Sequence, residues 1–356
     1  MVCRFLMPLL LFSMLACFAW AGAPVSVEDW KPRHVTFSAD EMMLDRVLTE
    51  LQHQTGNVVE DRRGSASNRK VKLSAKPTEF WKALDLIGKE TGIGFSAYQA
   101  DGGVALVDAP YRALPTHYSG IFRFATKRIT VSRDDETQTH TCQVTLDTAW
   151  EPRFQMLYLS LDQATVDFGN GNEKLERQTA RSVAGTSAAE LELRMKAPAR
   201  QIAKLRSLNG QIRMIGAPKM LEFAFAKLHT KPIKQEGVNV SLTSVNKQSN
   251  RWSVEVLSEY PEGALVSLES YQSWMDNNRV WLSWGTDPKT KKPHELEPSG
   301  QSPQDSKLGT KIRYEFTPRA DTPLPSASVE VTLRTRLPNR VVAFTVPFAF
   351  QDLPLP

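Results

Sequence analysis

Apolar residues recur at the same spacing twice between residues 35 and 107. In each copy a short extended run is followed by apolar positions at i, i+3, i+4 and i+7, the spacing of a helix with one apolar face. These positions are Leu44, Val47, Leu48 and Leu51 in the first copy, and Phe80, Ala83, Leu84 and Ile87 in the second. A gapless offset of 36 positions pairs identical residues: Val35 with Val71, Ser38 with Ser74, Ala39 with Ala75, Leu48 with Leu84, Thr55 with Thr91 and Gly56 with Gly92.

The residues around each apolar run predict where the two helices begin and end. Ser38 to Glu41 has the form of a capping box, in which a serine oxygen and a glutamate carboxylate satisfy free amides of the first turn. Pro77-Thr78 is expected to open the second helix, and Gly56 and Gly92 are expected to end the two helices. The pattern predicts an α+β domain over residues 35–108, in which two βαβ repeats pack their helices on one side of a shared small sheet.

The order of these elements, with helices that end in Gln54-Thr55-Gly56 and Glu90-Thr91-Gly92, resembles the short N-terminal domain of secretins and TonB-dependent transducers. In that family the domain is an envelope module that docks other proteins, and it has no catalytic residues. The resemblance covers about a fifth of the chain. Secretins and transducers continue into a transport domain in the outer membrane, whose pattern the following residues lack. The resemblance therefore implies docking without transport.

The first 34 residues indicate the compartment. Residues 1–21 combine a basic start at Arg4, an apolar run from Phe5 to Phe18 and an Ala-Trp-Ala cleavage site, which predicts a secretory signal peptide. The apolar run is short for a membrane span. The alternative is lipid attachment at Cys17, and only then would the protein contact a membrane peripherally. Residues 22–34 lack periodicity and are expected to form a leader. We expect an exported protein in the periplasm or cell envelope of a bacterium.

Two all-β modules are predicted after a linker with two prolines at residues 108–117. Short apolar runs between turn residues predict a first β-sandwich over residues 118–228, with strands at 121–133, 141–149, 154–161, 188–195, 210–215 and 220–227. A boundary at 229–233 leads to a second sandwich over residues 234–356, with strands at 238–245, 252–257, 264–273, 279–284, 310–316, 328–336 and 341–350. Both are expected to be Ig-like sandwich domains. Residues 285–309 are expected to form a mobile exposed loop.

The two predicted sandwiches share one detail. Each is expected to close with an apolar strand of the form Phe-Ala-Phe, at residues 223–225 and 348–350. This ending suggests that the two modules are related. Together with the duplicated first domain, it also looks like a group of exported bacterial proteins of unassigned function.

The net charge, the single remaining cysteine and the tryptophan positions limit the kinds of partner and bond that we expect. The chain has 44 basic and 39 acidic residues, a formal net charge of +5, which is too modest to predict nucleic-acid binding by an exported protein. Cys142 is the one cysteine outside residues 1–21, so it has no internal disulfide partner, and its strand predicts a buried thiol. Trp281 and Trp284 are expected to point to opposite faces of one strand and to pack in a core, not to form a sugar platform.

No catalytic, cofactor-binding or metal-binding set can be assigned from the sequence. His294-Glu295 lacks the second histidine of a zinc motif, and the oxygen-rich turns at 167–172 and 276–278 do not have calcium-loop spacing. The candidate interaction surface is basic and joins the two copies of the duplicated stretch: Arg62, Arg63, Arg69, Lys70 and Lys72.

These features predict an exported, non-enzymatic envelope protein that acts as a docking or scaffold module. Two alternatives stay open. The chain could bind or process an envelope polymer or carbohydrate at sandwich loops, or it could be a structural surface protein. The envelope partner and the oligomeric state cannot be read from the sequence.

Overall fold

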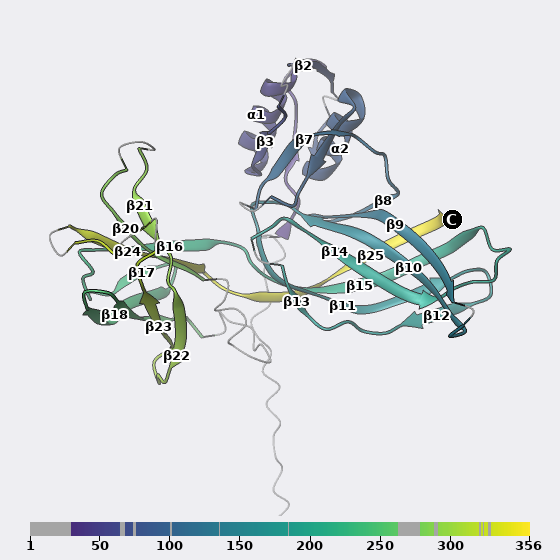
Figure 1. Cartoon of the computed structure of the whole chain (residues 1–356). Coiled ribbons are helices and arrows are strands. Elements are labelled where there is room, and N and C mark those ends of the chain that lie inside the picture. Colours follow the sequence, from purple (N-terminus) through teal and green to yellow (C-terminus); the bar gives the residue numbers. More distant parts are fainter. Residues whose placement is uncertain are drawn as a thin grey trace, which may run out of the picture.

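The computed structural model describes residues 30–64, 68–73, 76–99, 102–134, 136–183, 185–262, 278–287, 291–319, 322, 324–326 and 329–356. The described chain is mostly β structure, with two helices near its start (Figure 1). Neither of these helices is long and apolar enough to cross a membrane. The predicted signal peptide, Cys17, residues 22–29 of the leader and the predicted strand at 264–273 lie outside the described residues.

The duplication is visible in the two helices. α1 (Leu44–Thr55) and α2 (Phe80–Thr91) both have 12 residues and start 36 positions apart. Each is followed by a glycine in the left-handed conformation, Gly56 at φ 72° and Gly92 at φ 72°. Glycine is favoured there because a Cβ would be strained by that backbone. The predicted helix faces and ends are confirmed.

The predicted helix starts are wrong, because a short strand precedes each helix. β2 (Glu41–Met43) runs into α1, and β5 (Thr78–Glu79) runs into α2. The N-cap residues, Met43 and Glu79, are extended and make no side-chain cap hydrogen bond. Ser38 does not cap α1: its Oγ donates a 2.6 Å hydrogen bond to Glu50, in the middle of the helix.

The two copies exchange strands with each other. β1 (His34–Val35) pairs with β5, and β2 pairs with β4 (Lys70–Lys72), both antiparallel. Each pairing thus joins the first strand of one copy to the second strand of the other. A third sheet has the order β3-β7-β6, formed by β3 (Val59–Asp61), β7 (Val104–Pro110) and β6 (Ile93–Ser96). The prediction of a single sheet shared by the two copies is therefore wrong. Both helices bury their apolar faces in one common core.

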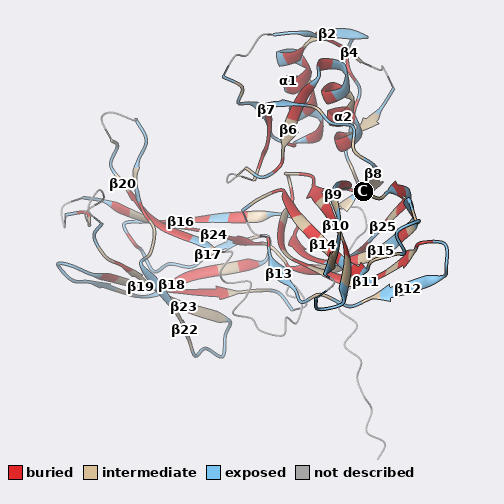
Figure 2. Cartoon of the chain, turned by 45° about the vertical axis from the view of Figure 1, so that its right-hand side comes forward, coloured by how far each residue is buried: buried red, intermediate tan, exposed pale blue. Residues whose placement is uncertain are grey.

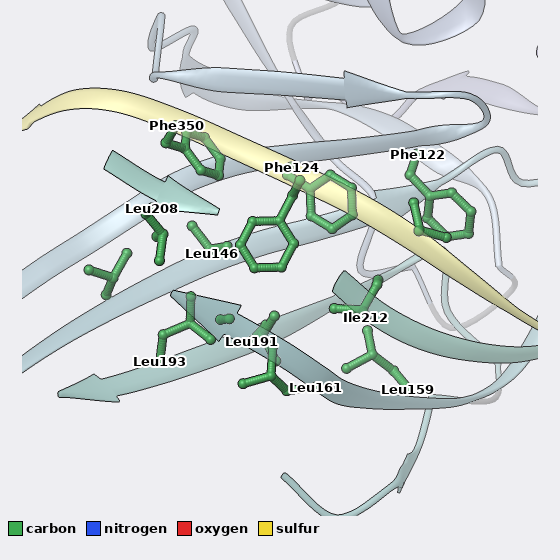
Figure 3. Packing of buried hydrophobic residues seen from close by; sticks show 14 of the residues in the cluster. Phe122, Phe124, Leu146, Leu159, Leu161, Leu191, Leu193, Leu208, Ile212 and Phe350 are labelled. Carbon is green, nitrogen blue, oxygen red and sulfur yellow. The ribbon is translucent and has the colours of Figure 1, made fainter. Parts of the chain in front are cut away.

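The first β unit has two sheets that face each other across a core. One has the order β14 (Ala188–Lys196), β10 (Thr139–Trp150), β9 (Phe122–Asp134) and β8 (Thr116–Ser119). The other has the order β12 (Asn172–Leu175), β11 (Gln155–Asp167), β15 (Lys204–Ala217) and β25 (Val342–Pro354), with β13 (Arg181–Ser182) also on β11. Figure 3 shows aromatic and aliphatic side chains of both sheets meeting between them, among them Phe124, Leu161 and Phe350.

The second β unit is built in the same way. One sheet has the order β16 (Met220–Ala226), β24 (Val331–Pro338), β20 (Arg279–Trp284) and β21 (His294–Leu296). The other has the order β17 (Ile233–Gln235), β18 (Val238–Lys247), β19 (Trp252–Glu259), β23 (Thr310–Phe316) and β22 (Gly300–Gln304). Residues 285–309 were expected to form a loop, but they contain β21 and β22. Pro303 is compatible with β22 because this strand lies at a sheet edge.

Two strands cross from one β unit to the other, which corrects the predicted domain boundaries. β15 continues into β16, and β24 continues into β25, so that Gly216 lies opposite Val342 and Met220 opposite Pro338. The register is unchanged across the junction, where the Asn339 amide donates to the Lys219 carbonyl at 2.9 Å. The two units are thus joined by a paired ribbon (Figure 1) and not by a linker at 229–233.

The crossing also reassigns the two Phe-Ala-Phe strands. Phe223 and Phe225 lie in the core of the second unit, whereas Phe348 and Phe350 lie in the core of the first. Each strand therefore completes the unit opposite to the one predicted from its place in the sequence. The chain's last strand packs beside β15 and returns the C-terminus to the first unit.

Two segments expected to be a leader and a linker are anchored. The Trp30 ring lies 4.7 Å from the Phe154 ring and 4.6 Å from the Phe344 ring, between side chains of the first unit. Tyr111, between β7 and β8, lies so close to α2 that a Cβ on Gly88 would come within 2.4 Å of its ring. The first domain is therefore tied to the first β unit on both sides.

Candidate functional site

One stripe of α2 contacts the first β unit. Trp81, Asp85 and Gly88 lie at i, i+4 and i+7 and are all buried, and Trp81 also packs in the core of the helix's own domain. The Trp81 indole donates a 3.0 Å hydrogen bond to the Ile121 carbonyl of the β unit. Gly88 leaves the space that the Tyr111 ring fills. Figure 2 shows the helical domain seated above β8 and β9.

Asp85 is the centre of a buried charge network at this contact. Arg123 of β9 donates to both carboxylate oxygens, through Nε at 2.7 Å and Nη2 at 3.0 Å. The hydroxyls of Tyr111 and Tyr118 donate to the same carboxylate at 2.9 and 2.6 Å. Asp147 stands 3.8 Å from the other end of the Arg123 guanidinium. The carboxylate therefore accepts four hydrogen bonds, which a buried charge requires.

The environment fixes the protonation states of the surrounding groups. Burial and the negative charge of Asp85 raise the pKa of Tyr111 to about 12 and move the pKa of Tyr118 still further up. Burial disfavours the charged form of Arg123, but its hydrogen bonds to Asp85 and the negative charges of Asp85 and Asp147 together outweigh this, so its pKa is raised above the ordinary value. Both tyrosines are thus neutral hydrogen-bond donors and Arg123 is a cation at physiological pH.

A second buried contact ties the end of α1 to the same β unit. Glu151, which is 1% exposed, accepts from the Asn57 side chain at 3.1 Å, from Arg153 at 2.6 Å and from the Arg33 amide at 3.2 Å. The Asn57 side-chain oxygen in turn accepts from the Arg153 amide at 3.1 Å. The contact is a closed set of hydrogen bonds that holds Asn57, just after the helix, in a fixed position.

A third contact joins the β6–β7 turn to the strand β14 region. The Ser187 amide donates to the Ala97 carbonyl at 3.2 Å, and the Ser187 hydroxyl donates to the Gly102 carbonyl. Tyr98 donates to Asp147, and Lys127 lies over the Tyr98 ring at 5.3 Å. Three separate contacts fix both the position and the rotation of the first domain on the β unit.

The 36-residue symmetry gives α1 a face equivalent to the docked face of α2. Trp81, Asp85 and Gly88 correspond to Asp45, Thr49 and Gln52, which lie on one stripe of α1 and are all exposed. The two helices therefore present matching faces in different states. The α2 face is covered by the chain's own β unit, and the α1 face is open to solvent.

The structure places the predicted basic surface beside acidic partners. Arg62 pairs with Glu60 at 2.8 Å, and Arg63 pairs with Asp61 through two bonds at 2.8 and 2.7 Å. The hydrogen bond from Arg63 lowers the pKa of Asp61. Arg69 donates to the Thr91 carbonyl at 3.2 Å, and Lys70 pairs with Glu41 at 3.2 Å. Lys72 is exposed on β4. Most of this charge is thus balanced within the domain, which weakens the surface as an anion site.

The other residues that were considered as candidate sites lie where they serve the fold. Cys142 is fully buried in β10 and free, and burial raises the pKa of its thiol to about 11. Trp281 is 4% exposed and packs under Arg279, at 4.4 Å. In the turn at Asp167, the aspartate carboxylate accepts hydrogen bonds from the Gly169 and Gly171 amides. The described residues contain no cluster of three or more His, Cys, Asp or Glu side chains able to hold a metal ion.

Sequence reasoning missed the docked face of α2, although a signal was present. Trp81 and Gly88 interrupt the polar side of an amphipathic helix, whereas the first copy has Asp45 and Gln52 there. An apolar ring and a missing side chain on a polar face indicate a contact surface.

Comparison of the sequence with models of known protein families gave no match. Comparison with curated proteins gave no significant match either.

Proposed function

We propose that this protein is an exported, non-enzymatic component of a bacterial cell envelope, and that its first domain is a docking module carried on a β scaffold. Residues 1–21 would direct export and would be removed, and the family resemblance of residues 35–107 supports a docking role. The two β units are proposed to be Ig-like sandwiches that share the crossing ribbon.

The observation that carries this proposal is the unequal use of two equivalent helix faces. The α2 face already binds a protein surface, through Trp81, Asp85 and Gly88. The domain fold is therefore able to dock on a β-sandwich by this face. The equivalent α1 stripe of Asp45, Thr49 and Gln52 is exposed and points to a partner outside the described chain.

The fixed position of the domain supports the same role. A buried ion pair costs desolvation and gives little net stability, but it rejects other arrangements of the surfaces that meet around it. Asp85–Arg123 and the Glu151 set would thus hold the α1 face in one orientation relative to the rest of the chain. A scaffold that presents a partner-binding face needs such a fixed orientation.

The test is photocrosslinking in the cells that produce the protein. A photoreactive amino acid replaces Thr49 or Gln52 on α1, and matched control positions are Ser244 of β18 and Thr345 of β25, which are also exposed. We expect one protein adduct shared by both α1 positions and missing from both controls. A photoreactive residue at Lys72 tests the basic surface separately.

Two outcomes would contradict the proposal. Adducts that do not differ between α1 and the control positions would remove the docking face. Turnover of an envelope polymer by the purified protein, abolished by one substitution, would replace the proposal with an enzyme. Export is checked on the same material, since cleavage as proposed leaves Gly22 as the first residue of the mature protein.

A further inference from the structure

A second surface, on the first β unit, has the properties of a ligand site and does not depend on the docking proposal. The sheet β12-β11-β15-β25 has on it a groove of about 600 Å³. This volume is in the range of small-molecule sites in proteins. In Figures 1 and 2 the strands β11 and β12 lie on the side of the unit away from the helical domain.

The register of the strands identifies the side chains that face the groove. Ala164, Gly210 and Phe348 lie opposite one another in adjacent strands, and Ala164 and Phe348 point into the core. Neighbouring residues on a strand point to the other side of the sheet. The flanking rows, Gln163–Gln211–Pro347 and Thr165–Asn209–Ala349, therefore point outward into the groove.

These outward rows carry three amide side chains and one hydroxyl that are not used by the fold. Within the described chain, the side chains of Gln163, Asn209, Gln211 and Thr165 make no hydrogen bond, and the first two are exposed. An amide offers two donors and two acceptor lone pairs, and a hydroxyl both donates and accepts. Four such groups line one groove, together with the apolar Pro347 and Ala349 of β25.

The charges at the rim argue against a strongly charged ligand. Arg177 is paired with Asp162 at 3.3 Å, which leaves Lys174 as the lining cation without a partner in the described chain. A nucleic acid or other polyanion would need several such cations.

The position of the groove argues against a peptide strand. An added strand pairs through free backbone groups at a sheet edge. The groove instead crosses the face of four paired strands, over roughly 14 Å at about 4.8 Å per strand. The backbone groups of β11 and β15 are bonded to their neighbours. Side-chain amides are then the groups left to recognise a ligand.

We propose that this groove binds a linear, uncharged oligosaccharide. The sugar hydroxyls would exchange hydrogen bonds with Gln163, Gln211, Asn209 and Thr165, and a sugar face would rest on Pro347 and Ala349. The β-bulge at Leu161–Gln163 brings Gln163 into this row, which is a frequent use of bulges next to binding sites.

The test is titration calorimetry of the purified full chain with tetramers of glucose and of N-acetylglucosamine, each in a β-1,4-linked and an α-1,4-linked form where available. We expect one tetramer to bind in the micromolar to low-millimolar range. The pair Gln163→Ala and Gln211→Ala should weaken that binding about tenfold, because each lost hydrogen bond weakens it several-fold. Ala349→Trp, which fills the groove from an outward position, should abolish it.

Two control variants show whether a loss of affinity is specific to the groove. Arg213→Ala and Thr345→Ala alter outward residues of β15 and β25 that face each other beside the groove, and they should leave the affinity unchanged. Thermal unfolding shows that each variant is folded. No binding of any tetramer at millimolar concentration overturns the proposal. So does binding that Ala349→Trp leaves intact, or tighter binding of a short polyglutamate that Lys174→Ala abolishes.

Discussion

Substitution of Arg123 most directly tests what holds the first domain on the β unit. In the variant Arg123→Met the Asp85 carboxylate keeps two tyrosine hydroxyls but loses its cation and two hydrogen bonds. Asp85 is only 9% exposed, so water cannot replace the lost partner while the domain stays docked. Removal of one partner from a buried ion pair costs about 3–5 kcal/mol. Undocking exposes the carboxylate to water and relieves this cost.

The expected effect is a large rise in the undocked population. At about 1.4 kcal/mol per factor of ten, a cost of about 3 kcal/mol raises that population about a hundredfold. The Ser187 amide reports it directly, because this amide is bonded to Ala97 of the first domain and Ser187 is 1% exposed. Hydrogen exchange of the peptide that contains Ser187 should accelerate by about two orders of magnitude. Peptides from the second β unit should not change.

Two further variants show whether the faster exchange comes from the uncompensated charge of Asp85 or from the smaller side chain at position 123. Arg128→Met removes an exposed arginine from the same strand and should leave Ser187 exchange unchanged. Asp85→Asn, added to Arg123→Met, removes the uncompensated charge. Its amide oxygen accepts from one tyrosine hydroxyl and its NH2 donates to the other, so it should restore much of the protection. If Arg123→Met exchanges like the wild type, the ion pair does not hold the domain and the reasoning fails.

Three other predictions follow from single contacts. Gly88→Ala should destabilise the chain in urea unfolding, although alanine favours helix by about 1 kcal/mol, because its Cβ would come within 2.4 Å of the Tyr111 ring; a gain in stability would contradict that contact. Cys142 should resist iodoacetamide at pH 8 until the chain is unfolded, since burial raises its thiol pKa to about 11, and labelling of the native protein at the rate of a free thiol would be the opposite result. The hydrogen bond from Arg313 lowers the pKa of Glu255 in the folded state, so its stabilisation is present at neutral pH and is lost as pH falls through the folded value. Glu255→Gln should thus cost about 0.5–1 kcal/mol at pH 7, and this cost should shrink as the pH falls through the lowered pKa of Glu255; a constant difference at all pH values would refute this.

Local periodicity predicted the elements of the fold well. The apolar stripes of α1 and α2, their glycine ends and strands such as Arg279–Trp284 and Thr310–Phe316 follow from residue types within a few positions of each other. The helix starts failed because Met43 and Glu79 are held extended by strands paired with the other copy. That pairing is not local, and no capping motif can reveal it.

Strand partners were beyond the reach of the same reasoning. The passages at Pro218-Lys219 and Asn339-Arg340 have the composition of ordinary turns, although the chain changes from one β unit to the other there. The pairing of β15 with β25 joins residues more than 120 positions apart, which no local pattern encodes. The docked α2 face was accessible in principle, by comparing Trp81 and Gly88 with Asp45 and Gln52 of the first copy.

The docking role of the α1 face is tested most directly by photocrosslinking. A photoreactive residue at Gln52 reports the partner, and Asp45→Arg with His53→Glu changes the charge of two exposed α1 residues beside it. Matched changes on the second β unit, Ser244→Arg and Asn246→Glu, serve as the control. We predict that the adduct from Gln52 falls at least about tenfold with the α1 changes, equivalent to about 1.4 kcal/mol, and persists with the control changes. An adduct of unchanged yield in the α1 variant would contradict the account.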